Sequence, residues 1–230
     1  MLFYRRSTKV TQCFLLFFLG YTAVCISDDQ AAVFRFYKRV YNIYRFRKEP
    51  KMIYFTSDLH FDHARAIQLC LRPFTTVEQM NQAIIDNWNK TVTNKDEIYI
   101  LGDITLSHNA EKAQNYLLQL NGIKHLIKGN HDQFVNSIHF KPNIFASVQD
   151  YKEFKYQGWN FALMHYPILD WNHMYSGKGF MLHGHSHNKP EYNEKNIREG
   201  LKRFDVGVDA NNYTPVSIES IIKKFTQKNK

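Results

Sequence analysis

The sequence predicts an α/β fold for residues 52 to 230, arranged as a layered α-β-β-α sandwich. In the first half of this stretch strand-like and helix-like segments alternate, and the second half is rich in strands. Five short polar blocks lie between residues 58 and 187, and each one ends an apolar run. Because active-site groups in such folds collect at the carboxyl ends of strands, the blocks predict a single site there.

The first half of this region predicts two strands and two helices in alternation. Ile53–Ser57 is a short run of residues that favour strands, and Glu97–Leu101 is a second one. Between them, Thr75–Val92 carries apolar residues at a helical period, with Thr75 or Thr76 as its N-cap. Ala110–Leu120 is predicted as a second helix, which stops at an Asn-Gly pair.

The second half predicts four further strands, each a short run bounded by turn residues. Their apolar content suits a buried sheet, and a polar block follows most of them directly. The predicted strands are Lys124–Lys128, Asn160–Met164, Gly179–His183 and Arg203–Val208.

The polar blocks contain the residue types that bind divalent cations. Carboxylates, histidines and one asparagine supply O and N ligands, which must converge from several chain segments to hold two hard or borderline cations. Within the last block, His185 and His187 lie on the same side of an extended chain. We therefore expect a two-metal hydrolytic centre. The blocks are DLH (58–60), GD (102–103), GNHD (129–132), MHYP (164–167) and GHSH (184–187).

The formal charge of +9 is concentrated at the start of the chain. Residues 1 to 51 hold ten Lys and Arg against three Asp and Glu, whereas residues 52 to 230 hold twenty against eighteen. A nearly neutral core does not favour nucleic acid as the partner. The three cysteines are Cys13, Cys25 and Cys70, an odd set that argues against a disulfide framework and against a cysteine-based zinc finger.

Residues 1–51 form a separate N-terminal segment in this interpretation. Basic residues precede an apolar run from Val10 to Ile26, which is the layout of a signal peptide cut after Ser27 or of an uncut anchor. From Val33 to Lys51, aromatic and basic residues interleave, which suits either contact with an anionic membrane surface or a solvated linker.

An over-extended N-terminus is a third alternative for the same segment. Met52 stands at the first residue of the first predicted strand, where an initiator methionine could lie. A start at Met52 would predict a cytoplasmic protein. Translation from Met1 would predict one that is membrane-anchored or secreted. The domain prediction is accordingly 1–51 for the segment and 52–230 for the catalytic domain.

The order of the five blocks resembles the calcineurin-like metallophosphoesterase family, over nearly all of residues 52 to 230. This resemblance implies that the fourth and fifth blocks complete two metal sites begun by the first three. His131 would lie over the leaving-group oxygen as an acid, with Asp132 orienting it. Asp103 would bridge the two ions. The implied ligands are Asp58, His60 and His187 for the first ion, and Asn130, His165 and His185 for the second.

The chemistry of these side chains agrees with such a centre. A carboxylate can bridge two cations because it has two oxygens and a full charge, whereas a neutral Asn carbonyl keeps the site attractive to a phosphate dianion. A hydroxide held by the cations would then attack phosphorus in line. The ligand set suits Mn, Fe, Zn or Ni without distinguishing among them.

Two further residues are candidates for substrate contact. Arg72 could clamp a phosphate with its bidentate fork, although a structural ion pair is the alternative. His108 follows the second block and could line the cleft. His63, close to the first block, could reach substrate but suits a capping or surface role.

The expected substrates are small phosphate esters or nucleotides. The second block continues as GDITLSH, without the Asp and Arg of the protein-phosphatase branch, and the core is compact, as in the bacterial or phage type of phosphoesterase. The alternatives are a non-catalytic binding module with this fold and a nuclease. The sequence does not indicate the oligomeric state.

Overall fold

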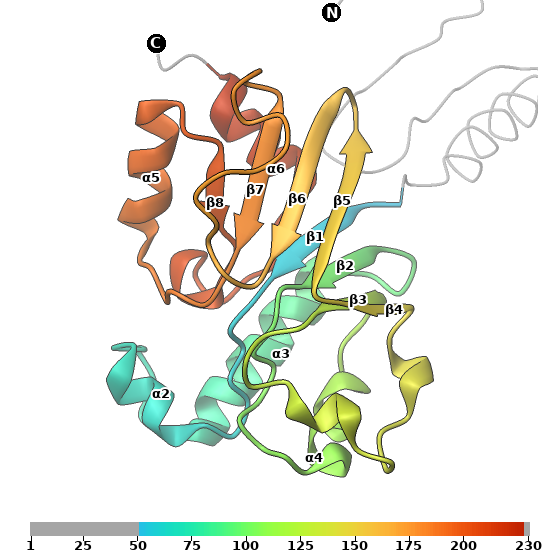
Figure 1. The fold of residues 1–230 in the computed structure, drawn as a ribbon. Coiled ribbons are helices and arrows are strands. Elements are labelled where there is room, and N and C mark those ends of the chain that lie inside the picture. Colours follow the sequence, from blue (N-terminus) through green and yellow to red (C-terminus); the bar gives the residue numbers. More distant parts are fainter. Residues whose placement is uncertain (1–50, 228–230) are drawn as a thin grey trace, which may run out of the picture. The chain divides into compact units, whose positions relative to one another are not determined.

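Two stacked β-sheets form the centre of the computed structural model, which describes residues 51–227 (Figure 1). The predicted signal peptide, anchor, linker and alternative start therefore lie almost wholly outside the described residues. Within residues 51–227, no helix combines the length and apolar character that a membrane span requires. The fold class is the predicted α/β type with two sheets.

The first sheet has the order β4-β3-β2-β1-β9 and contains the first three predicted strands. Its four strands β1 to β4 are parallel, and β9 joins the edge in the antiparallel direction. The edge strands β4 and β9 were not predicted, because two or three residues are too few to show an apolar period. The strands are β1 (Ile53–Thr56), β2 (Glu97–Ile100), β3 (Ile123–Ile127), β4 (Ser147–Gln149) and β9 (Val216–Ser217).

The second sheet has the order β5-β6-β7-β8. An antiparallel hairpin joins β5 (Tyr151–Tyr156) to β6 (Trp159–Met164), and β7 (Gly179–His183) and β8 (Arg203–Asp205) continue in parallel. The prediction for β8 extended to Val208, which instead begins a 3-10 turn. β5 was not predicted.

Alternation along the strands places one apolar layer between the two sheets. Phe55 of β1 stacks on Phe161 of β6, with ring centroids 6.4 Å apart, and Phe161 stacks on Phe180 of β7 at 5.0 Å. The intervening residues point to the opposite faces, as the two-residue period of a strand requires. Ile98 therefore belongs to the layer under the helices, whereas Tyr99 lies between the sheets.

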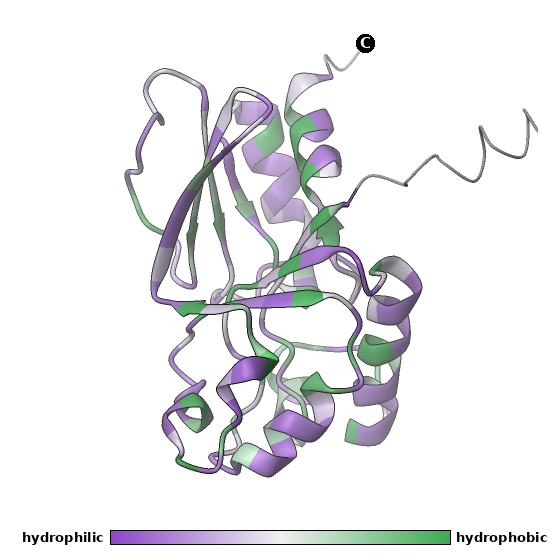
Figure 2. Ribbon diagram, turned by 90° about the vertical axis from the view of Figure 1, so that its right-hand side faces the viewer, coloured by the Kyte–Doolittle hydropathy of each residue, from purple (hydrophilic) through white to green (hydrophobic). Residues whose placement is uncertain are grey.

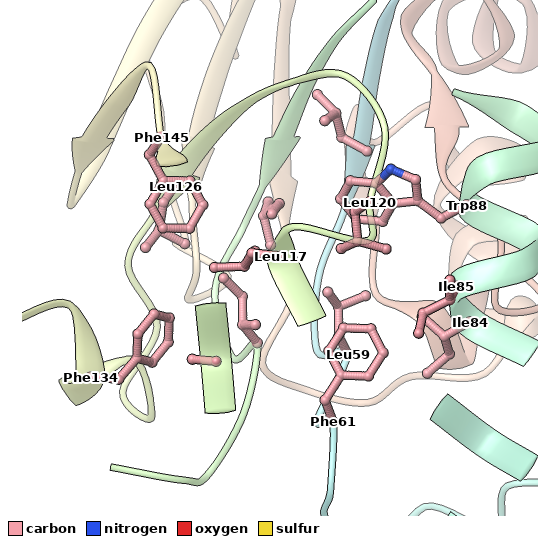
Figure 3. Packing of buried hydrophobic residues seen from close by; sticks show 14 of the residues in the cluster. Leu59, Phe61, Ile84, Ile85, Trp88, Leu117, Leu120, Leu126, Phe134 and Phe145 are labelled. Atoms are coloured by element: carbon pink, nitrogen blue, oxygen red, sulfur yellow. The ribbon is translucent and has the colours of Figure 1, made fainter. Parts of the chain in front are cut away.

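Helices α3 (Val77–Thr91) and α4 (Ala110–Leu117) cover the outer face of the first sheet. Figure 3 shows this layer, in which residues of α3 and α4 pack against the loop after β1. The side chain of Thr76 accepts a hydrogen bond from the amide of Gln79, which confirms it as the N-cap. The α4 helix ends three residues before the predicted Leu120, because the backbone there tightens into i to i+3 turns.

Three helices were not predicted: α2 (Ala64–Leu69), α5 (Pro190–Glu199) and α6 (Ile218–Thr226). The α5 helix buries Asn193 and Asn196, whose amides bond to the backbone of β8, so its inner face carries no apolar period. In Figure 2 the helices carry hydrophilic and hydrophobic residues side by side.

The outer face of the second sheet is covered differently from the first. The loop between β6 and β7 places Trp171 against Ala162 and Met181, and the indole donates a hydrogen bond to the carbonyl of Gly179. The α5 helix packs on β8, the edge strand of this sheet. The fourth layer of the predicted sandwich is thus part helix and part loop.

We expect Ile84→Ala to destabilise the protein by about 2 to 4 kcal/mol, because the truncation leaves a cavity in the layer between α3 and the first sheet. Ile84 is 1% exposed. Ile138→Ala, at a residue that is 93% exposed, is the matched control and should change the free energy of unfolding by less than about 0.5 kcal/mol. Urea denaturation of both variants measures the difference, and equal losses would contradict the packing described.

Candidate metal centre

The polar blocks meet where strands of both sheets end. Beyond β1 and β2 the two chain segments stay paired: the amide of Asp58 donates to Gly102 at 3.0 Å, and the amide of His60 donates to Asp103 at 3.1 Å. In the second sheet, the amide of Gly184 donates to the carbonyl of His165 at 3.0 Å. Backbone bonds therefore join the first block to the second and the fourth to the fifth, whereas the carboxylates of Asp103 and Asp132 join the third block to the second.

Asp58, His60 and His187 form the first cluster. The Nε2 atoms of His60 and His187 lie 3.1 Å apart, and the Nε2 of His187 lies 3.9 Å from Oδ1 of Asp58. Asp58 is fully buried, and both its oxygens face the backbone amide of His185. Three donor atoms thus converge from segments 127 residues apart.

Asp103, His165 and His185 form the second cluster. The Nε2 of His165 lies 3.2 Å from Nδ1 of His185 and 3.5 Å from Oδ2 of Asp103. The Oδ1 of Asn130 lies 3.0 Å from the same Nε2, so the asparagine joins this cluster from the solvent side.

Asp103 lies between the two clusters. Its Oδ2 is 3.8 Å from Nε2 of His60 in the first cluster and 3.5 Å from Nε2 of His165 in the second. Its Oδ1 accepts a hydrogen bond from the amide of His131 at 3.0 Å. This is the position that a bridging carboxylate requires, and the seven predicted ligands therefore lie together in one place.

Hydrogen bonds on the far side of two imidazole rings direct their other nitrogens into the site. The Nδ1 of His165 donates to the carbonyl of Leu101 at 2.7 Å, which leaves Nε2 free to act as a ligand. The Nδ1 of His187 lies 2.8 Å from Oδ2 of Asp209. A carboxylate behind a histidine fixes its ring and raises its basicity as a metal ligand.

The backbone adopts left-handed conformations at most of the predicted ligands. Such positive φ angles are uncommon outside glycine, and they cost about 1 kcal/mol or more per residue. The residues are Asp58 (58°), His60 (51°), Asp103 (57°), His185 (67°) and His187 (47°). The prediction that His185 and His187 lie on one side of an extended chain is therefore wrong, because both residues adopt this conformation and belong to different clusters.

Gly184 allows the last block to approach the first. A Cβ atom at this position would lie 2.0 Å from Oγ of Ser57 and 2.4 Å from Oδ2 of Asp58. No side chain fits in that space, so the backbone itself closes the site beneath Asp58.

The shifted pKa values in the first cluster indicate an environment that favours a bound cation. Burial raises the pKa of Asp58 to about 8, and it lowers the pKa of His60 to about 2. For His187, burial lowers the pKa, but the hydrogen bonds to Asp209 and Cys70 and the negative charge of Asp58 together outweigh it, and the pKa rises to about 10. These residues fit a divalent cation, which would stabilise the carboxylate and occupy the converging imidazole nitrogens.

Asp132 does not orient His131, which corrects the prediction. Its carboxylate accepts three backbone hydrogen bonds, from Gly129 at 2.8 Å and from Asp103 and Ile104 at 2.9 Å each. Asp132 therefore ties the second block to the third. Although Asp132 follows His131 directly in sequence, its side chain points away from that ring and joins the loops that carry the second and third blocks.

Arg72 forms a buried ion pair, the alternative to a phosphate clamp. Its Nη2 lies 2.8 Å from Oδ2 of Asp209, and its Nε donates to Oδ1 at 3.0 Å. The remaining N–H groups reach the carbonyls of Asp58 and Leu59 and the sulfur of Met80. With its guanidinium fully buried and every donor engaged, Arg72 has none left for a ligand in the cavity.

A cavity of about 370 Å³ opens over the two clusters. His131 lines it, with a side chain that is 38% exposed. His108 is exposed before α4 and is not among the lining residues, so the structure does not support a substrate contact there. His63 does line the cavity, and its side chain makes no capping bond to α2.

Asp209 and Cys70 also lie near the site, although no pattern in the sequence indicated it. Asp209 lies shortly after β8, where the sequence shows only a single acidic residue after a strand. Its contact with Arg72 joins residues 137 positions apart, which no local pattern predicts. Cys70 lies beside His187 and Asp209 at the end of α2, a helix that the sequence did not predict.

A family model described as calcineurin-like phosphoesterase matches residues 51–217. The uncharacterized protein MJ1445 of Methanocaldococcus jannaschii is 38% identical over 174 residues, which are 75% of this chain and 90% of that protein. The gene 66 protein of Mycobacterium phage L5 is 36% identical over 83 residues, 34% of this chain and 39% of its own.

A solved structure is also similar to this chain. The protein of unknown function AQ665 from Aquifex aeolicus superposes with a TM-score of 0.60 at 29% identity, over 76% of this chain and 99% of that one.

We expect Asp132→Asn to destabilise the protein by about 2 to 3 kcal/mol, because one amide oxygen cannot replace a carboxylate that accepts three buried N–H bonds. Asp150→Asn is the matched control, since its side chain is 81% exposed in a pair with Lys128. Thermal unfolding measures both variants. An equal decrease in unfolding temperature in both variants would contradict the role of Asp132 in holding the two loops together.

Cation binding should release protons from the Asp58 carboxyl below about pH 8 and from the His187 ring below about pH 10, because both protonated groups compete with the cation. Affinity should therefore rise steeply as the pH increases toward 8 and less steeply from 8 toward 10. Isothermal titration with Mn²⁺ in buffers of different ionisation enthalpy measures the protons released. Asp58→Asn should release fewer, and an affinity independent of pH would refute the prediction.

Proposed function

Because the chain belongs to the calcineurin-like phosphoesterase family, we propose that it is a metal-dependent hydrolase that cleaves phosphate mono- or diesters. The position of Asp103 carries this proposal. One of its oxygens lies within 4 Å of histidine nitrogens from both clusters, at 3.8 Å and 3.5 Å. A carboxylate shared in this way suits a two-metal site for in-line displacement.

Seven side chains would hold the two cations. Both clusters offer N and O donors, which suit Mn²⁺, Fe, Zn²⁺ or Ni²⁺. When bound, such a pair supplies a nucleophile near neutral pH and stabilises charge on the phosphoryl oxygens. The proposed ligands are Asp58, His60 and His187 with the shared Asp103 on one side, and Asn130, His165 and His185 on the other.

His131 is the proposed proton donor to the leaving group. Its Nε2 lies 4.0 Å from Oδ2 of Asp103, at the wall of the cavity, and its backbone amide is anchored on the other oxygen of the same carboxylate. The ring is therefore close to the reaction centre but is not buried in either cluster. A positioned histidine accelerates such a reaction by about 10² to 10⁴-fold.

The cavity favours a small substrate. Its volume of about 370 Å³ lies at the small end of the range for ligand sites. The described residues that line it include neither lysine nor arginine, whereas a nuclease needs cations that follow the phosphate backbone. We therefore favour a small phosphate ester over nucleic acid.

We expect Asp103→Asn to abolish nearly all turnover and His131→Ala to lower kcat by about 10² to 10⁴-fold. The measurement is hydrolysis of p-nitrophenyl phosphate and bis(p-nitrophenyl) phosphate by the Mn²⁺-loaded protein, with unfolding temperatures to verify the fold. His139→Ala, at an exposed histidine away from the cavity, is the matched control and should retain activity.

The alternative is a non-catalytic binding module with the same fold. Lack of turnover with Mn²⁺, Zn²⁺, Ni²⁺ and Fe²⁺ across both ester types would favour that alternative. Full activity in His131→Ala would leave hydrolysis in place but remove this residue from the mechanism.

A further inference from the structure

We propose that α2 and the residue after it form a rigid apolar wall that binds the leaving group of the substrate, and that this group is aromatic or apolar. The inference rests on the proposed phosphoesterase function and deepens it. Ala66, Leu69 and Cys70 line the cavity beside the first cluster. We call these three residues the α2 wall.

Both apolar and polar residues line the cavity. Polar groups line the part that the α2 wall does not, among them Asn130 and His131, and the ligand histidine His187 lies beside Cys70. A phosphoryl group bound at these polar groups would leave its organic substituent free to contact the α2 wall. Leu69 is 66% exposed there, so contact with an apolar substituent would remove its side chain from water.

The leaving group would depart toward the α2 wall if His131 protonates it. The ring centroid of His60 is 5.8 Å from that of His131, the proposed acid, and 5.5 Å from that of His63, which immediately precedes α2. His63 and His131 therefore both line the cavity next to the ring of His60. A leaving-group oxygen within reach of His131 directs the rest of that group toward α2.

Two hydrogen bonds hold the last turn of α2 in place. The amide of Arg72 donates to the carbonyl of Ile67 at 2.8 Å, and the ammonium of Lys189 donates to the carbonyl of Cys70. The guanidinium of Arg72 then bonds to Asp209, which also holds His187. This chain of contacts fixes the backbone of the α2 wall relative to the metal ligands, which lowers the ordering cost of binding.

The charges around the cavity limit the number of phosphates that a substrate can carry. Without lysine or arginine among the described lining residues, a second or third phosphate would find no cationic partner beyond the metal centre. We therefore expect a single phosphoryl group esterified to an aromatic or apolar alcohol, rather than a nucleoside di- or triphosphate.

Two non-hydrolysable phosphonates test the α2 wall without turnover. Benzylphosphonate and 1-naphthylmethylphosphonate differ by one fused ring, and their binding to the Mn²⁺-loaded full chain can be measured by titration calorimetry. We expect the naphthyl compound to bind about five- to tenfold more tightly, as burial of the additional ring predicts. Leu69→Asn should reduce this ratio to below about twofold.

Leu118→Asn is the matched control. Leu118 is also an exposed leucine at the C-terminal end of a helix, 69% exposed against 66% for Leu69, but it does not line the cavity. The variant should keep the preference of the unmodified protein. Because both leucines are largely exposed, neither substitution should alter folding.

Hydrolysis of 1-naphthyl and phenyl phosphate, measured in parallel, separates the two proposals. A binding preference that is lost only in Leu69→Asn supports the α2 wall, even if no ester is hydrolysed and the phosphoesterase proposal fails. Turnover without any binding preference overturns the α2 wall and leaves the phosphoesterase proposal standing. A preference that survives in Leu69→Asn also overturns it, as does failure of both phosphonates to bind.

Discussion

The buried ion pair between Arg72 and Asp209 is the contact on which the site depends. The guanidinium binds both carboxylate oxygens and also the carbonyls of Asp58 and Leu59 in the turn after β1. Asp209 in turn holds the ring of His187 from the second sheet. Loss of either partner would leave a buried charge, at a cost of several kcal/mol. One pair thus joins the first block, the last block and the end of α2.

The same junction explains how unusual backbone geometry persists at the site. Five of the proposed ligands have positive φ angles, a conformation that costs free energy at each residue. Backbone bonds from Asp58 to Gly102, the close approach of Gly184 and the carboxylate of Asp132 hold these turns in place. The surrounding sheets therefore offset local strain and direct side chains from both sheets to one point.

Much of the fold was predictable because its signals are local. Strands β1, β2, β3, β6 and β7 were predicted within about two residues of their observed ends, and Thr76 caps α3 as one of two candidates. The α5 helix escaped prediction because asparagine amides, rather than apolar side chains, fill its buried face. The very short edge strands offered too few residues for a period.

For the site, the sequence by itself determined which donor types stand at which strand ends, and the seven proposed ligands do lie together. Their binding of cations stays a prediction. Only the tertiary structure decided the partners of Arg72 and Asp132 and the apolar side of the cavity. The Arg72 contact spans 137 residues, and the three acceptor bonds of Asp132 depend on two loops meeting. Such pairings follow from the packing of distant segments, which no local pattern encodes.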